Sequence, residues 1–296
     1  MLTINPKEVS VAKLHNYLLS SVAPRPICFA STMDKDGNPN LSPFSFFNVF
    51  SANPPVAIFS PARRGRDNTT KHTYENVKEI DEVVINVVNY EMVQQTSLAS
   101  TEYAQGVNEF TKAGFTPIAS QLVKPFRVKE SPVQMECKVQ EVVELGDEGG
   151  AGNLVICEIL LMHIDESILN ETGGIDQNKI DLVARLGGNW YCRASGDSLF
   201  EVAKPLTTIG IGVDEIPIEI RLSKVLTGNN LGQLGNCERM PASQEIDEYK
   251  NSELFTHTLH ILNVNIDHFD KNKHIIAKHL LDEGKVDEAW KILMLQ

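Results

Sequence analysis

Residues 26–60 read PICFASTMDKDGNPNLSPFSFFNVFSANPPVAIFS, and this stretch decides the fold. It holds three short apolar runs, at residues 27–33, 41–50 and 56–60, separated by the segments DKDGNP and NPP. Segments rich in glycine, proline, asparagine and aspartate between such runs are typical of strands joined by tight turns. We therefore expect three consecutive strands here.

Short predicted strands and helices continue as far as residue 164. Residues 83–88 predict a fourth strand, residues 74–80 a short helix with Thr73 as its N-cap, and residues 90–100 a second helix. Short strands with few helices favour an antiparallel barrel, closed or partly open, over a sandwich of alternating strands and helices.

Two longer strands follow. Apolar and polar residues alternate over 133–139, as on a half-buried strand, whereas residues 154–164 are almost continuously apolar. We expect the second of these strands to be buried on both faces. The glycine-rich segment 146–152 joins the two as a hairpin loop.

The character of the chain changes near Pro205. Residues 206–245 are expected to be rich in loops, and two amphipathic segments follow at 273–281 and 286–295, broken by Gly284. We interpret these segments as a helical hairpin that packs on the barrel or on a partner subunit. The predicted organisation is a barrel domain over residues 1–205 and a C-terminal extension over residues 206–296.

Composition excludes several classes of protein. The net charge of −12 argues against a nucleic-acid binder, which needs a basic face. No run approaches the roughly 18 apolar residues of a membrane span, and the first 21 residues lack the apolar block of a signal peptide. The five cysteines form no CxxC pair, so we expect packing residues in a reducing, cytoplasmic setting without membrane association.

The usual catalytic signatures are also absent. The sequence contains no HExxH, GxSxG or Walker A motif, and its histidines show no paired metal-ligand spacing. The nearest approach to a dinucleotide fingerprint, Gly210-Ile211-Gly212, has Glu215 at its third glycine position and no βαβ context. We therefore expect neither a metal site nor a Rossmann site.

Hydroxyl and aromatic side chains gather in the segment Ser42-Pro43-Phe44-Ser45-Phe46-Phe47-Asn48. On one continuous strand, Ser42, Phe44, Phe46 and Asn48 would share a face. Such a strand could give a planar ligand both apolar cover and hydrogen-bonding partners. The same pattern also suits an aromatic core strand with serines at its ends, so both interpretations stay open.

Basic residues gather just downstream. The segment Ser60-Pro61-Ala62-Arg63-Arg64-Gly65-Arg66-Asp67-Asn68-Thr69-Thr70-Lys71-His72-Thr73 carries four Arg or Lys residues into the start of a predicted helix. A helix N-terminus with nearby cations is a favourable place for a phosphate group. A solvated basic loop is the alternative when this segment is taken alone.

The two segments together resemble the flavin reductase-like family, which includes flavoredoxin-type proteins and the reductase components of two-component flavin monooxygenases. The matching residues occur in order over roughly residues 15–195. They are Ala23-Pro24-Arg25-Pro26-Ile27, Ser31-Thr32-Met33-Asp34, Gly37-Asn38, Asn40 to Asn48, Asn53-Pro54-Pro55, Lys71-His72-Thr73, Asn76, Glu109-Phe110, Glu130-Ser131-Pro132-Val133, Glu136-Cys137 and Arg185-Leu186-Gly187-Gly188. At Lys71-His72-Thr73, relatives usually have Lys-Asp-Thr. The difference at His72 puts a contact by that side chain in doubt.

The resemblance implies FMN bound on a split β-barrel, in a homodimer with the flavin near the subunit boundary. It implies that the ring and ribityl chain are lined by Ser42, Phe44, Ser45, Phe46 and Asn48. Ser31 and Thr32 would reach the ribityl chain or phosphate, and the phosphate would be held by Ser60, Arg63, Lys71 and Thr73. Arg185 and Tyr191 would lie near the mouth of the pocket, although a structural arginine at a strand end is an equal alternative.

Three functions remain open on this basis. The first is a reductase that passes hydride from NADH or NADPH to flavin N5, a step that needs no protein acid or base, so no catalytic residue is named. The second is a flavoredoxin-like carrier that keeps FMN and exchanges electrons with a protein partner. The third is a flavin-binding module or an oxidase on the same barrel, since fold alone does not fix function.

Overall fold

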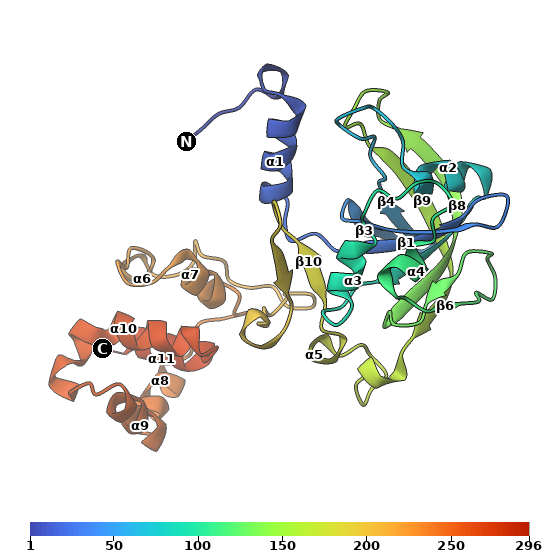
Figure 1. Cartoon of the computed structure of the whole chain (residues 1–296). Helices are drawn as coiled ribbons and strands as arrows, with labels where there is room; N and C mark the ends of the chain where they lie inside the picture. The colour runs from blue at the N-terminus through green and yellow to red at the C-terminus, as the bar shows by residue number, and fades with distance from the viewer. Residues whose placement is uncertain (296) are drawn as a thin grey trace. The chain divides into compact units, whose positions relative to one another are not determined.

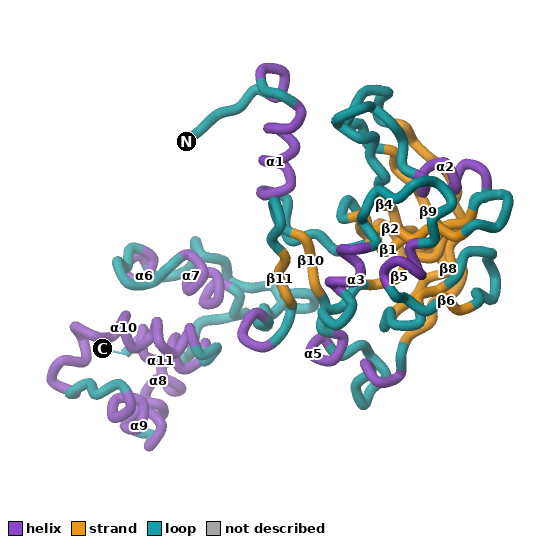
Figure 2. The backbone as a smooth tube through the Cα atoms, in the orientation of Figure 1, coloured by secondary structure: helices purple, strands orange, loops and turns teal. Residues whose placement is uncertain are grey.

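The computed structural model describes residues 1–295. The chain divides into two compact units, Met1–Phe200 and Glu201–Gln296. Every strand belongs to the first unit, and the described part of the second consists of helices and loops (Figure 2). None of the helices within residues 1–295 is long and apolar enough to cross a membrane.

Seven strands form the main sheet of the first unit. They are β1 (Cys28–Met33), β2 (Pro39–Phe44), β3 (Phe47–Ala52), β4 (Pro55–Phe59), β5 (Glu82–Val87), β8 (Val133–Glu144) and β9 (Asn153–Ile164). Their order is β2-β1-β5-β8-β9-β4-β3, and every pairing is antiparallel. Figure 1 labels β1, β3, β4, β8 and β9 of this sheet. β2 and β3 lie at opposite edges, yet only Ser45 and Phe46 separate them in the chain. The sheet must therefore curve until its edges approach at this link, and no ladder closes them within the described residues.

The prediction of one strand over residues 41–50 is wrong. The chain breaks at Ser45-Phe46 and crosses from one edge of the sheet to the other. Pro43, which has no N–H to donate, is tolerated because β2 is an edge strand. The expected shared face therefore does not exist, because Ser42 and Phe44 belong to β2 while Asn48 belongs to β3.

The other strand predictions in the first unit are confirmed, with one correction. Strands β1, β4 and β5 lie where the apolar runs predict them, and β8 and β9 form the expected hairpin. However, β9 is not buried on both faces. Burial alternates along it, with Val155 and Cys157 buried while Leu160 and Met162 are 43% and 48% exposed. The apolar run therefore predicts the strand correctly, but it does not predict that both faces of the strand are buried.

Two apolar clusters hold the first unit together. One lies on one face of the sheet and includes Phe44, Phe59 and three cysteines, Cys28, Cys137 and Cys157, which confirms their packing role. The other joins residues of β1 and β2 to the segments that follow β5, and it includes Phe29, Leu41, Phe110 and Val183. All five cysteines of the chain are free thiols.

Short helices and ribbons surround the sheet. The helices are α1 (Val11–Ser21), α2 (His72–Glu79), α3 (Val93–Leu98), α4 (Glu109–Ala113) and α5 (Gln177–Ile180). The two-stranded ribbons are β6 (Pro117–Ile118) with β7 (Arg127–Val128), and β10 (Val183–Arg185) with β11 (Tyr191–Arg193). Thr73 is not the N-cap of α2: Lys71 occupies that position, and Thr73 lies within the first turn.

The second unit has a helical core of its own. Its helices are α6 (Ile218–Arg221), α7 (Gly228–Gly235), α8 (Ser243–Lys250), α9 (Glu253–Ile261), α10 (Phe269–Asp282) and α11 (Val286–Met294). The segment 206–245 is thus more helical than expected. The hairpin of α10 and α11 breaks at Gly284, which has a φ of +76°. Its apolar face, including Leu280 and Trp290, is covered within this unit, and Trp290 Nε1 donates to Leu234 O at 3.1 Å.

Candidate binding site

A cavity of about 370 Å³ lies in the first unit, where three segments meet. The end of β2, the helix α3 and the ribbon of β10 and β11 form its walls. Arg25 and Arg185 exchange two backbone hydrogen bonds of 2.9 Å, which fixes the ribbon beside the start of β1. The volume lies within the range of cavities that hold small organic ligands.

The walls of this cavity are mostly polar, with apolar cover from a few side chains. Phe44 lines it and also packs on Phe59, with ring centroids 5.5 Å apart. On the facing ribbon, the guanidinium of Arg185 lies 4.5 Å from the ring centroid of Tyr191. The hydroxyl of Thr96 on α3 is buried and has no hydrogen-bond partner among residues 1–295. Buried hydroxyls are normally paired, so this one stands out as a candidate ligand contact on a residue that lines the cavity.

A smaller pocket of about 30 Å³ lies at the N-terminus of α2. Ser42, Arg64, Lys71 and Thr73 line it, together with residues that follow α3. Ser100 lines both this pocket and the larger cavity. The strand β2 also borders both, because Ser42 lines the pocket while residues 43–45 line the cavity, and three residues of extended chain cover about 10 Å.

The pocket at α2 brings two cations to a helix N-terminus, and the carboxylates of Glu102 and Glu109 line it as well. No side chain caps the helix, so its N-terminal dipole faces the pocket beside Arg64 and Lys71. His72 responds to this field: burial first, and then the charges of Arg64 and Lys71, lower its pKa from the ordinary value. The arrangement suits an anion such as a phosphate group.

A carboxylate, Glu102, already contacts these cations. Glu102 Oε1 lies 2.9 Å from Arg64 Nε and 3.4 Å from Lys71 Nζ, and its other oxygen pairs with Arg66. The hydrogen bond from Arg64 is the largest cause of the lowered pKa of Glu102; desolvation, the next in size, opposes it, and the charges of Lys71, Arg66 and Arg64 add to the lowering.

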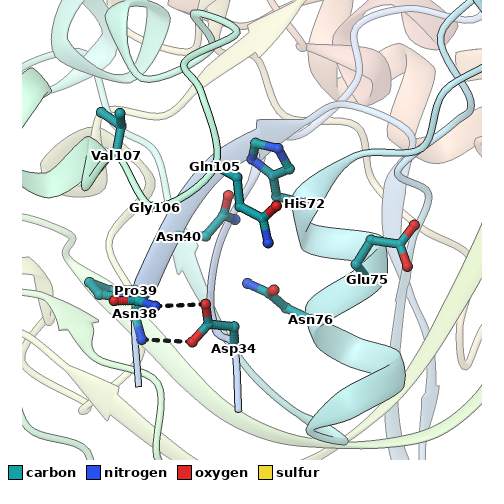
Figure 3. Close-up of a pocket in the computed structure, with 10 residues that line it drawn as sticks. All are labelled: Asp34, Asn38, Pro39, Asn40, His72, Glu75, Asn76, Gln105, Gly106 and Val107. Carbon is teal, nitrogen blue, oxygen red and sulfur yellow. Dashed lines mark hydrogen bonds between the residues drawn. The ribbon is translucent and has the colours of Figure 1, made fainter. Parts of the chain in front are cut away.

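A buried amide network fixes the first turn of α2 on the sheet. Asn40 Nδ2 donates to Thr73 Oγ1 at 2.9 Å and to Thr32 Oγ1 at 3.2 Å, and Asn76 Nδ2 donates to Thr32 Oγ1 at 3.1 Å. Asn40 and His72 also line a second, polar cavity of about 80 Å³ next to the pocket (Figure 3). Gln105, from the connection between α3 and α4, lines the same cavity (Figure 3).

The structure brings five of the eleven predicted site residues to the two spaces. Phe44 and Ser45 line the larger cavity. Ser42, Lys71 and Thr73 line the cationic pocket.

Three other predicted residues are buried beside the site. Thr32 belongs to the amide network, and Ser60 Oγ accepts from Asn153 N at 3.1 Å, which ties the end of β4 to β9. The hydroxyl of Ser31 is buried without a partner, but it lines neither space.

The last three lie outside both spaces. Arg63 binds Asn68, with Nε donating to Oδ1 at 2.7 Å. Phe46 is 40% exposed and meets His15 edge-on at 6.1 Å. Asn48 is exposed on β3, where Oδ1 accepts from Val49 N at 2.8 Å.

Three residues of the site were missed by the sequence analysis. Arg64 lies in the quoted basic segment, but nothing in the sequence separates it from its neighbour Arg63. Thr96 and Glu102 lie in or just after a predicted helix, and no local pattern marks either residue. Their roles depend on how α3 and its following loop fold back over β2.

Residues 20–179 match the family model described as a flavin reductase like domain. An uncharacterized protein of Aquifex aeolicus is 39% identical over 196 residues, which cover 66% of this chain and 97% of that protein. The matched residues include both spaces apart from the β10–β11 ribbon, and the second unit lies beyond them.

Two solved structures have a similar fold. Nitrilotriacetate monooxygenase component B from Bacillus cereus superposes with a TM-score of 0.64 at 29% identity, covering 68% of this chain and 98% of that one. A putative flavin reductase with a split barrel domain from Shewanella frigidimarina superposes with a TM-score of 0.58 at 27% identity, covering 69% and 100%.

Proposed function

This chain belongs to the flavin reductase-like family, and on that premise we propose that it is an NAD(P)H-dependent flavin reductase that binds FMN in its first unit. One observation carries the proposal. A single strand, β2, borders both a 370 Å³ cavity with an unpartnered buried hydroxyl and a cation-lined pocket at a helix N-terminus. A flat ring joined to a phosphate by a short chain requires such a pair of spaces.

The phosphate group of FMN is assigned to the pocket at α2. Lys71 and Arg64 supply charge there, and Ser42 and Thr73 supply hydroxyls. The ring is assigned to the larger cavity, between β2 and the helix α3. Three other residues proposed from the resemblance are then buried beside the site and do not line either space. They are Ser31, Thr32 and Ser60.

The chain's contribution to the reaction is to bind and orient. FMN, when bound, supplies the ring that accepts hydride from NADH or NADPH. Phe44 and Tyr191 give the cavity apolar contact area for the ring, while Ser45 and the hydroxyl of Thr96 are assigned to hydrogen-bond a ring edge. No side chain need act as an acid or base, because holding two reacting groups in register is itself the main catalytic contribution.

A homodimer with a split barrel is part of the proposal. The open seam between β2 and β3 supports the split barrel. The helix α1 supports the dimer, because it buries none of its residues and leaves Tyr17 and Leu18 38% and 47% exposed. An isolated helix of eleven residues is marginal in water, so we expect a second copy to cover it.

The second unit is proposed to be an appended helical domain that does not hold the flavin. The family model ends at residue 179, and the second unit has its own apolar core. The five free thiols support a reducing, cytoplasmic setting.

The visible spectrum of the purified protein tests the proposal, followed by anaerobic addition of NADH and then NADPH. We expect yellow protein, or protein that takes up FMN in preference to FAD, and bleaching of the flavin band by one of the two nucleotides. FAD binding as tight as FMN binding would refute the FMN assignment. Flavin that is bound but bleached by neither nucleotide would refute the reductase and favour the electron carrier.

A further inference from the structure

Glu102 occupies the position at which an incoming anion would meet the cations of the pocket. Its carboxylate contacts Arg64, Arg66 and Lys71 and is itself part of the pocket wall. The space left beside it in the pocket is small, about 30 Å³. A phosphate that binds these cations must therefore compete with the carboxylate for them.

The segment that carries Glu102 has few polar contacts with the rest of the unit. The backbone hydrogen bonds of residues 100–107 join them to one another or to the last residues of α3, and Lys112 Nζ of α4 lies 5.6 Å from the ring centroid of Tyr103. Within the described part of the chain, the ion pairs of Glu102 are the polar contacts that tie this segment to the basic loop before α2. Most of these residues are exposed, so releasing the ion pairs uncovers little apolar surface.

We propose that Glu102 is an intramolecular competitor for the flavin phosphate, so that it weakens FMN binding and speeds FMN release. The carboxylate is attached to the same chain, and it therefore competes at a high effective concentration. Each time the phosphate leaves, Glu102 takes its place on the cations and opposes rebinding. This inference rests on the proposed FMN site, and it deepens the reductase proposal because a reductase must exchange its flavin.

The competing role makes a prediction opposite to that of a positioning role. A carboxylate that only held Arg64 and Lys71 in place would leave weaker FMN binding when its charge is removed. Removing the charge of a competitor tightens FMN binding. Glu102→Gln removes the charge with almost no change in size, so it separates the two directly.

The test compares FMN dissociation constants and stopped-flow release rates of the wild-type protein, Glu102→Gln and Glu91→Gln. Glu91 is exposed before α3 and lines neither space, so its variant controls for the same change in net charge. We expect Glu102→Gln to bind FMN about tenfold more tightly, the size expected when part-exposed ion pairs no longer compete. Riboflavin, which lacks the phosphate, should bind all three proteins equally.

The outcomes separate this inference from the proposed function. Unchanged or weaker FMN binding by Glu102→Gln overturns the inference, as does an equal gain for riboflavin or for Glu91→Gln. Glu102→Ala repeats the measurement with a different side chain and should also tighten binding. If the wild-type protein binds no FMN at all, the proposed function itself fails.

Discussion

Replacing Lys71 by Met and Thr73 by Val should separate the phosphate contact from the stability of the fold. Lys71 is part-exposed, and within the described residues Glu102 is the one polar partner of its ammonium, so Lys71→Met should leave the melting temperature unchanged. A charge-assisted hydrogen bond contributes about 1.5–3 kcal/mol, so losing it should weaken FMN binding about 10- to 150-fold.

Thr73→Val should also cost stability. The buried Thr73 Oγ1 accepts from Asn40 Nδ2, which keeps a longer bond of 3.2 Å to Thr32. Losing one such bond costs about 1 kcal/mol, or roughly 2–4 °C in melting temperature for a unit of this size. The double variant should bind FMN at least about 100-fold more weakly, because both contacts to the phosphate are lost.

Isothermal titration with FMN and riboflavin, together with thermal melts, measures both effects. Lys129→Met is the matched control, because Lys129 is exposed and lines neither space. Riboflavin affinity should not change in Lys71→Met. A loss of tenfold or less in a double variant that still melts cooperatively would mean that the phosphate binds elsewhere.

Three further predictions follow from single features. Thr96→Val should leave the melting temperature unchanged or higher, because it removes a buried unpaired hydroxyl, yet weaken FMN binding; equal affinity in both proteins would show that this hydroxyl does not meet the ring. His72 should titrate below its ordinary pKa of 6.5 in the free protein, so its contribution to stability is complete above pH 6.5 and is lost as the pH falls through the lowered pKa. Proton NMR, with His72→Gln for assignment, should show that FMN binding raises this pKa. An unchanged pKa would place the phosphate away from α2. A chain ending at Phe200 should fold and keep the FMN affinity of the full protein, because both spaces lie in the first unit; a large loss of affinity would give the second unit a part in the site.

Most of the sheet was predictable from the sequence because its turns are strongly marked. The segment DKDGNP separates β1 from β2, and the glycine-rich loop separates β8 from β9. The break at Ser45-Phe46 was not predictable in this way. No glycine or turn motif marks it, and it arises because the chain must pass between two edges of a curved sheet.

The type of site was predictable from the sequence, but several of its individual residues were not. A phosphate pocket at the start of α2 follows from the basic segment and the helix N-terminus. The choice between Arg63 and Arg64 depends on distant contacts, since Arg63 N donates to Ala151 O at 2.9 Å and so docks its loop on the β8–β9 hairpin. Glu102 could not be found from the sequence, because its partners lie more than thirty residues away.

The strand order also sets when the site can form during synthesis of the chain. Val56 of β4 pairs with Glu158 of β9, so the edge of β4 stays unpaired until the second half of the first unit has left the ribosome. Arg185, which completes the wall of the larger cavity, emerges later still. Pairings between such distant segments form slowly and leave strand edges exposed in the meantime. A nascent chain that stalls before Arg185 would thus hold nearly all of its sheet residues without a finished pocket, and it would depend on chaperones rather than on its ligand for protection.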